Sequence, residues 1–281
     1  MAQAGEVAER LARAGVESEL VPMMTSGDRG EPVATSPAGM KGLFVAEIVR
    51  ALRAGEVDVA VHSAKDLPAA DDDGVVVAAV PPRADPSDLL VTRDPWLRAG
   101  AIVGTSSVRR RAQLAPLRPE LRIVALRGNV DRRLRKLEDG EVDGLVLAAA
   151  GIARLGLTPP SSEVLPIVPA PGQGCLAVQA RADDDATRRA VASLDDPDSR
   201  VAFEAERSLM ARLGGGCALP LGALATVSPD GVRLVALVAS PDGTRMVRVE
   251  AEAATPGGAA EAAAAELLTR GAGEILADVR P

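Results

Sequence analysis

The chain has 281 residues, 47% of them hydrophobic, which is enough apolar material for the cores of two or three domains. No apolar run approaches the roughly 20 residues of a membrane span, and the N-terminus lacks the regions of a signal peptide. A net charge of −7 and three aromatic residues exclude a broad basic face or stacking platform for nucleic acid. We therefore expect a cytoplasmic protein with a small-molecule partner, and neither a membrane nor a nucleic-acid partner.

Cysteine and histidine are scarce. Cys175, Cys217 and His62 are too few for a disulfide framework or a Cys/His metal site, so we expect a reducing compartment and no metal. His62 has no second histidine or cysteine nearby in the sequence, and we expect it to be structural. Cys175 opens an apolar run that extends to Val178, which favours a place in a core.

Hydrophobic periodicity predicts alternating helices and strands in the first half of the chain. Residues 52–58 and 137–143 each read as a helix end, a glycine stop and the start of an apolar strand, which indicates two similar α/β domains. The expected helices are 6–13, 43–54, 107–115 and 129–137, and the expected strands are 17–24, 57–62, 101–103, 122–126 and 144–148.

Proline-rich segments at 81–86 and 166–174 predict two crossings between these domains. After residue 197 the pattern predicts a helix at 200–213, strands at 221–227, 232–239 and 244–251, and a helix at 259–269. We therefore expect three domains, namely residues 1–82 with 173–196, residues 83–172, and a small α+β domain at 197–281.

Charged and small polar residues gather where the expected strands end, which is where parallel α/β sheets bind ligands. The hydroxyl-rich turn 104–107 opens a helix with Arg109 and Arg110, and the helix dipole there favours an anion. A single such arginine is most often a solvated charge, but several facing one cleft suit a ligand with many carboxylates or phosphates. The other loops are 62–66, where Lys65 and Asp66 form either a local ion pair or an acid/base site, 127–133 with Arg127, Arg132 and Arg133, and the segment after residue 148 with Arg154.

Cys217 follows three glycines in the turn GGGCALPLG at 214–222. A thiol on such an open turn is placed to hold a group covalently or to react. The alternative is a small buried hydrophobe, which is how most free cysteines are used.

Five motifs, in order, resemble those of the porphobilinogen deaminase, or hydroxymethylbilane synthase, family. They are VHSAKDLP at 61–68, GTSSVRR at 104–110, LRGNV at 126–130, PGQG at 171–174 and GGCALP at 215–220. The resemblance implies an α/β fold with two similar, periplasmic-binding-protein-like domains that form a cleft, plus a small C-terminal α+β domain. It implies a monomeric transferase that joins four porphobilinogen molecules, releases ammonia at each step and frees hydroxymethylbilane by hydrolysis.

The resemblance also implies roles for individual residues. Asp66 matches the catalytic aspartate, whose carboxylate stabilises the azafulvenium cation left when ammonia departs. Cys217 matches the cysteine that binds a dipyrromethane cofactor through a thioether. Cofactor contacts are implied for Lys65, Thr105, Ser106, Ser107, Arg109 and Arg110. Substrate contacts are implied for Ser63, Arg127, Arg133 and Arg154, and for Lys41 in a segment that resembles the family's lid.

The N-terminus departs from the family pattern. The family opens with a strand and a G-T-R-x-S loop, whereas the first expected element here is a helix. We therefore expect the first strand of domain 1 to be missing, which leaves its neighbours in the sheet with unpaired backbone groups. Two alternatives to a working deaminase follow: a homologue inactivated by this loss, and a two-domain anion-binding protein without chemistry.

Overall fold

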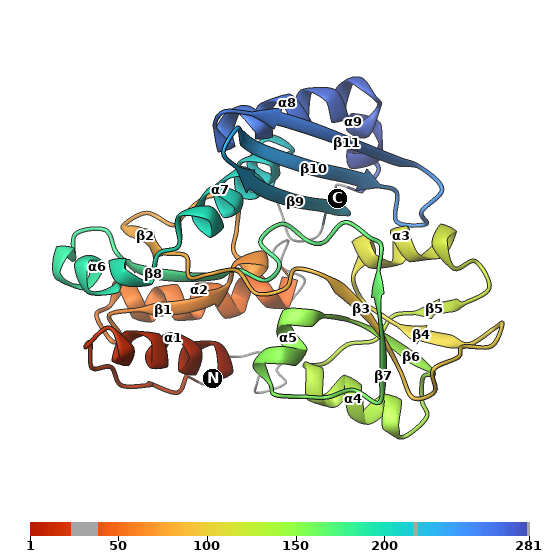
Figure 1. The fold of residues 1–281 in the computed structure, drawn as a ribbon, viewed down its shortest axis with the longest axis horizontal. Helices are drawn as coiled ribbons and strands as arrows, with labels where there is room; N and C mark the ends of the chain where they lie inside the picture. Colours follow the sequence, from red (N-terminus) through yellow and green to blue (C-terminus); the bar gives the residue numbers. More distant parts are fainter. Residues whose placement is uncertain (24–38, 216–218, 280–281) are drawn as a thin grey trace.

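The computed structural model describes residues 1–23, 39–215 and 219–279. Two α/β lobes lie side by side, and a C-terminal α+β domain lies against both of them (Figure 1). This arrangement confirms the fold class expected from the sequence. In the described part of the chain, no helix is both long and apolar enough to cross a membrane.

The first lobe is built on a sheet whose described strands run in the order β1-β8-β2, with β8 antiparallel to both neighbours. Because β8 comes late in the sequence, the chain leaves this lobe, builds the second one and returns. The elements of the first lobe are α1 (Ala2–Arg13), α2 (Gly39–Arg53), β1 (Ala60–Ser63), η1 (Ala64–Asp66), β2 (Val75–Ala79), β8 (Leu176–Arg181), α6 (Asp185–Val191) and η2 (Ala192–Leu194).

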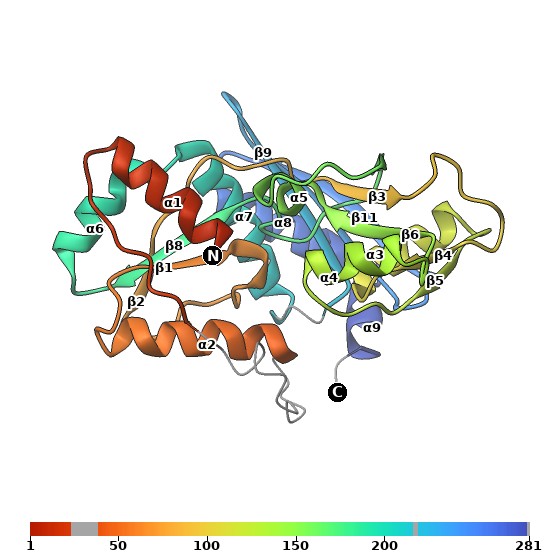
Figure 2. The ribbon, with the colours of Figure 1, turned by 90° about the horizontal axis from the view of Figure 1, so that it is seen from below.

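Two helices cover opposite faces of this sheet (Figure 2). Val49 and Leu52 of α2 pack with Ala177 on one face, while Val7 and Leu11 of α1 pack with the residues next to it on the other. Successive side chains of β8 therefore alternate between two cores, as a strand buried on both sides requires. The expected core position of Cys175, just before β8, is confirmed, because its side chain is fully buried.

The strand expected at 17–24 is wrong for the residues that the structure describes. Residues 17–23 carry no strand, and Leu20 and Val21 are 40% and 53% exposed. An isolated strand leaves its N–H and C=O groups unpaired, so it persists only beside a neighbour. Among the described strands, β1 is paired with β8 on one edge only, and none of them pairs with residues 17–23. Met24 lies outside the described residues.

The second lobe has a five-stranded sheet in the order β5-β4-β6-β3-β7. The strands β4, β5 and β6 are parallel, and β3 runs antiparallel to β6 and β7. Helix α3 packs on one face, and α4 and α5 on the other. The elements are β3 (Asp88–Thr92), β4 (Ile102–Gly104), α3 (Val108–Leu117), β5 (Arg122–Val124), α4 (Val130–Glu138), β6 (Gly144–Ala148), α5 (Ala149–Arg154) and β7 (Ser161–Leu165).

The C-terminal domain is an antiparallel sheet in the order β11-β10-β9, covered by three helices. Its first helix is capped by Asp196, which accepts a hydrogen bond from the Ser199 N–H at 2.9 Å, and Pro197 occupies the first turn. The elements are α7 (Pro197–Arg212), β9 (Leu221–Ser228), β10 (Gly231–Ala239), β11 (Met246–Ala253), α8 (Pro256–Thr269) and α9 (Ala272–Ala277).

The three parts of the molecule meet at Glu206 of α7, whose side chain is fully buried. Its carboxylate accepts two hydrogen bonds from Arg83, at 2.6 and 3.2 Å. It also accepts the N–H groups of Gly172 at 2.6 Å and of Ala225 at 2.7 Å. Arg83 and Gly172 lie in the two proline-rich segments between the lobes, and Ala225 lies in β9. One carboxylate therefore joins both connections to the C-terminal domain.

Candidate functional site

Polar groups of the second lobe gather at the carboxyl edge of its parallel strands. Strands β4 and β6 end there at Gly104 and Ala148, and β3 runs the other way, so its first residue, Asp88, pairs with Ala148. The edge therefore carries a buried carboxylate beside the turn that begins α3. The sequence indicated the turn but not Asp88, because its strand was not among those expected.

The hydroxyl groups of the turn at 105–107 organise the start of α3. Ser107 is the N-cap and accepts a hydrogen bond from the Arg110 N–H at 3.3 Å. Thr105, which is buried, accepts the Ser107 N–H at 3.2 Å, and Ser106 donates to the Leu126 carbonyl at 2.7 Å. These contacts fix the position from which Arg109 and Arg110 project.

Arg109 and Arg110 both reach the carboxylate of Asp88, at 2.7 Å each. All three side chains are nearly or fully buried, and Gln173 donates to the same carboxylate at 2.9 Å. Burial alone would raise the pKa of Asp88, but the charges of the two guanidinium groups lower it to about 2. The cluster therefore holds two positive charges against one negative charge.

Arg133 adds a further positive charge beside this cluster. Its Nε atom is buried and has no hydrogen-bond partner among the described residues. Burial and, next, the charge of Arg110 lower the pKa of Arg133. A buried guanidinium donor left without an acceptor is costly unless a ligand supplies one, so this position favours an anion.

Two other predicted residues of this lobe have different surroundings. Arg127, in the loop between β5 and α4, is exposed. Arg154, at the end of α5, is nearly buried and donates to Glu6 and to the Gly174 carbonyl, both at 2.8 Å. The structure therefore brings Arg109, Arg110 and Arg133 together, and it ties Arg154 to the first lobe.

The first lobe presents its own loop at the carboxyl end of β1. Ser63 ends the strand, and Lys65 and Asp66 follow in η1, all three half-buried. Ser63 pairs in register with Leu176 of β8, so the 171–174 segment leads into the sheet beside this loop. A Cβ on Gly172 would lie 2.9 Å from the Ala64 carbonyl carbon, which shows how closely the two segments pack.

His62 is buried in β1, and the structural role expected for it stays a prediction. Burial lowers its pKa from 6.5 to about 4, and the nearby carboxylate of Asp66 opposes this effect only in part. The imidazole is therefore neutral at pH 7.

Two predicted site residues lie beyond what the structure describes. Cys217 is outside the described residues. Lys41 lies in α2, but its side chain is outside them. The contacts expected for these two side chains therefore stay predictions.

Two polar residues at this site were not predicted to bind or catalyse, and each holds another group in place. Gln173 joins the lobes, donating to Asp88 and to the Pro86 carbonyl at 2.7 Å. Glu6 of α1 binds Arg154, and a carboxylate 148 residues away in the sequence gave no signal of this contact. The arrangement as a whole can bind carboxylate arms through guanidinium groups, and the carboxylate of Asp66 lies in the loop at the end of β1.

Comparison with solved structures gives alignments at low TM-scores. The methionine-binding protein MetQ gives a TM-score of 0.43 at 15% identity, over 70% of this chain and 87% of that chain. An amino acid ABC transporter substrate-binding protein of Streptococcus pneumoniae, bound to L-arginine, gives 0.38 at 17% identity, over 68% and 75%.

Sequence comparison gives much closer matches. A family model described as the dipyromethane cofactor binding domain of porphobilinogen deaminase matches residues 1–189, and one for its C-terminal domain matches residues 201–276. The porphobilinogen deaminase of Roseiflexus castenholzii is 48% identical, over 89% of this chain and 86% of that protein. That of Brevibacillus brevis is 44% identical, over 93% and 87%.

Proposed function

Since this chain belongs to the porphobilinogen deaminase family, a family of transferases in tetrapyrrole biosynthesis, we propose that it is an active hydroxymethylbilane synthase. It joins four porphobilinogen molecules head to tail, releases one ammonia at each step, and frees hydroxymethylbilane by hydrolysis. The anion-binding protein without chemistry is not favoured by the relatives, which are named as deaminases.

The observation that carries this proposal is the excess of buried positive charge around Asp88. Arg109 and Arg110 share one carboxylate, and the buried Nε of Arg133 beside them has no partner among the residues that the structure describes. Porphobilinogen carries an acetate and a propionate arm, so a chain of such units offers the carboxylates that this cluster lacks.

The dipyrromethane cofactor of the family fits these residues on the same ground. When bound, it supplies the pyrrole end to which the first substrate unit is joined. We propose that Cys217 holds it through a thioether, with Lys65, Thr105, Ser106, Ser107, Arg109 and Arg110 around its polar arms. Ser63, Lys41, Arg127, Arg133 and Arg154 are the proposed substrate contacts.

Asp66 is the proposed catalytic residue. Its half-buried carboxylate lies in η1, beside a neutral His62, so no imidazolium competes for it at pH 7. A fixed negative charge there stabilises the positive charge that develops on a pyrrole ring when ammonia departs. The N–H group of the same ring is a natural donor to this carboxylate.

We also propose that the protein is a cytoplasmic monomer.

A thioether needs a reduced thiol, and the other cysteine, Cys175, is free and buried, with burial raising its pKa to about 12. A thiol so weakly acidic is a poor nucleophile at pH 7, which leaves Cys217 as the attachment residue.

The test is turnover of porphobilinogen by the purified chain and by Asp66→Asn. We expect the wild type to release four ammonia molecules per hydroxymethylbilane. Asp66→Asn keeps the shape and loses the charge, so we expect kcat to fall on the order of 10²-fold or more while the fold is retained. An inactive wild type contradicts the proposed function, and near-normal turnover by Asp66→Asn contradicts the catalytic role of Asp66.

A further inference from the structure

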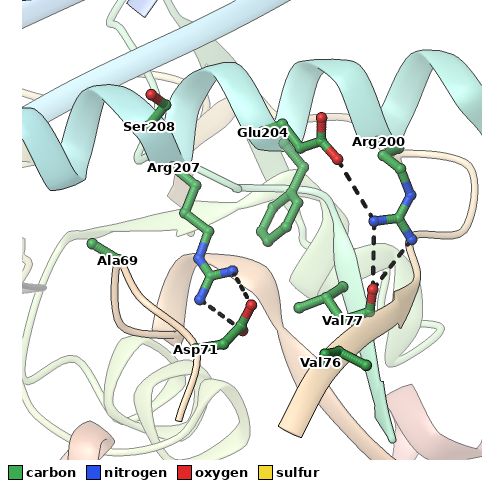
Figure 3. Close-up of a pocket in the computed structure, with 9 residues that line it drawn as sticks. Ala69, Asp71, Val76, Val77, Arg200, Glu204, Arg207 and Ser208 are labelled. Atoms are coloured by element: carbon green, nitrogen blue, oxygen red, sulfur yellow. Dashed lines mark hydrogen bonds and ion pairs between the residues drawn. The ribbon is translucent and has the colours of Figure 1, made fainter. Parts of the chain in front are cut away.

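Arg207 of α7 is bound to the loop that follows Asp66. Its Nε donates to the Pro68 carbonyl at 3.1 Å, and its two terminal nitrogens donate to the two oxygens of Asp71 at 3.1 and 2.8 Å. Figure 3 shows this paired contact across a cavity of about 280 Å³ between α7 and the first lobe. Such a planar, two-pronged contact fixes orientation as well as distance.

Further contacts hold the same loop against the end of α7. A Cβ on Gly215 would lie 2.8 Å from the Cβ of Ala69, so glycine is needed for this close approach. Ala69 also packs against the core of the C-terminal domain. The guanidinium of Arg207 lies 5.5 Å from the centre of the Phe203 ring, and Phe203 is part of the first-lobe core.

The geometry points to Arg207 as a positioning residue for Asp66, an inference that rests on the proposed function. Pro68 is only two residues beyond Asp66, and Gly215 is two residues before Cys217 in the sequence. By holding the 66–71 loop on α7, Arg207 sets where the catalytic carboxylate stands relative to the end of that helix. The proposed role of Asp66 depends on this position, because a fixed charge stabilises a developing cation only when it is correctly placed.

Other arginines of α7 do not have this role. Arg200, in the same cavity, binds Asp195 at 2.6 Å and the Val77 carbonyl at 3.4 Å. Arg212 binds Glu261 of α8 at 3.2 Å, with its side chain 41% exposed. Arg212 is therefore a matched control. It makes an ion pair from the same helix, but its partner is Glu261 of α8 and not a residue of the 66–71 loop.

The experiment compares Arg207→Met with Arg212→Met in steady-state turnover, corrected for the cofactor content measured by intact mass. A displaced carboxylate stabilises the transition state less well, while it has little effect on the binding of the substrate in its ground state. We expect Arg207→Met to lower kcat about 10-fold or more with KM within about 2-fold of wild type. Arg212→Met should leave both values unchanged. Arg207→Lys should restore part of kcat, because it keeps the charge but not the fork.

Asp71→Asn provides a second, milder route to the same answer. It should lower kcat as well. The double variant should have a kcat no lower than that of Arg207→Met alone, because both changes remove the same contact between Arg207 and Asp71. The NMR signal of His62, the single histidine, provides a measurement that does not depend on turnover, because the imidazole senses the charge of Asp66. This signal should shift in Arg207→Met and Asp71→Asn but not in Arg212→Met.

The outcomes separate the inference from the proposed function. An unchanged kcat and an unmoved His62 signal in Arg207→Met and Asp71→Asn overturn the inference. Equal losses in Arg207→Met and Arg212→Met overturn it too, because they show only a general effect on α7. An inactive wild type whose His62 signal still moves in Arg207→Met contradicts the proposed function and supports the positioning role.

Discussion

At the scale of single residues, the site is defined by positive charges that the described part of the chain does not fully neutralise. The single negative charge of Asp88 is shared by Arg109 and Arg110, so it does not also neutralise Arg133. Arg109 and Arg110 could be predicted as site residues from the hydroxyl turn and the helix start. Their shared partner could not, because Asp88 lies 21 residues before Arg109, on a strand that the periodicity did not reveal.

Arg133→Gln tests this excess of charge. We expect binding of porphobilinogen to weaken on the order of 10-fold, because a charged hydrogen bond to a carboxylate is lost. Thermal stability of the protein without ligand should stay equal or rise, because the buried Nε donor, which has no partner among the described residues, is removed. Arg132→Gln is the control, since that neighbouring side chain is exposed. Equal effects of the two variants on binding would contradict the assignment of Arg133.

His62 makes stability depend on pH. Its folded pKa of about 4 lies below the usual 6.5, so its contribution is present above pH 6.5 and is lost as the pH falls towards 4. In this pH window His62 is protonated in the unfolded chain but stays neutral in the folded protein. Between pH 7 and pH 5 the free energy of unfolding should therefore drop by about 2 kcal/mol on account of His62.

Urea unfolding of the wild type and of His62→Gln at both pH values measures this difference. The variant should lack this part of the drop, and the carboxyl of Asp88, with a pKa of about 2, stays charged throughout the window. A His62 signal that titrates near pH 6.5 in the folded protein would contradict the account.

At the scale of elements, glycine stops and polar caps could be predicted well. Gly55 and Gly140, which end two of the expected helices, have φ of +71° and +77°, a conformation that suits glycine. Ser107 and Asn129, the first residues of two expected helices, are N-caps that accept the N–H groups of Arg110 and Arg132. These features depend on local sequence alone, which is why the helices were placed within a few residues.

Strands were harder to predict because they depend on partners far away in the sequence. The apolar segment at 75–79 becomes β2 only through β8, about a hundred residues later. Residues 17–23 have the composition of a strand and form none in the described chain. Whether such a segment becomes a strand depends on a neighbouring strand with which it can pair, and hydrophobic periodicity does not predict that neighbour.

At the scale of the whole molecule, Glu206 holds the lobes and the C-terminal domain together. Glu206→Gln leaves Arg83 buried without a negative partner and changes the acceptor for two N–H groups. We expect a loss of about 3 kcal/mol in the free energy of unfolding, the lower end for a buried pair that loses one partner.

Chemical denaturation of this variant and of Glu204→Gln measures the loss. Glu204 lies on the same helix, is 48% exposed and approaches Arg200 at 3.8 Å, so its replacement should cost less than about 1 kcal/mol. If both variants unfold at the same denaturant concentration as the wild type, Glu206 does not join the three parts.

The central claim is that this chain carries a dipyrromethane on Cys217, and intact mass spectrometry tests it most directly. Protein purified from cells that make porphobilinogen should show an adduct of two pyrrole units. The adduct should be absent from Cys217→Ala and present in Cys175→Ser, whose thiol is buried and weakly acidic. An unmodified wild-type mass, or an adduct that survives in Cys217→Ala, would contradict the account.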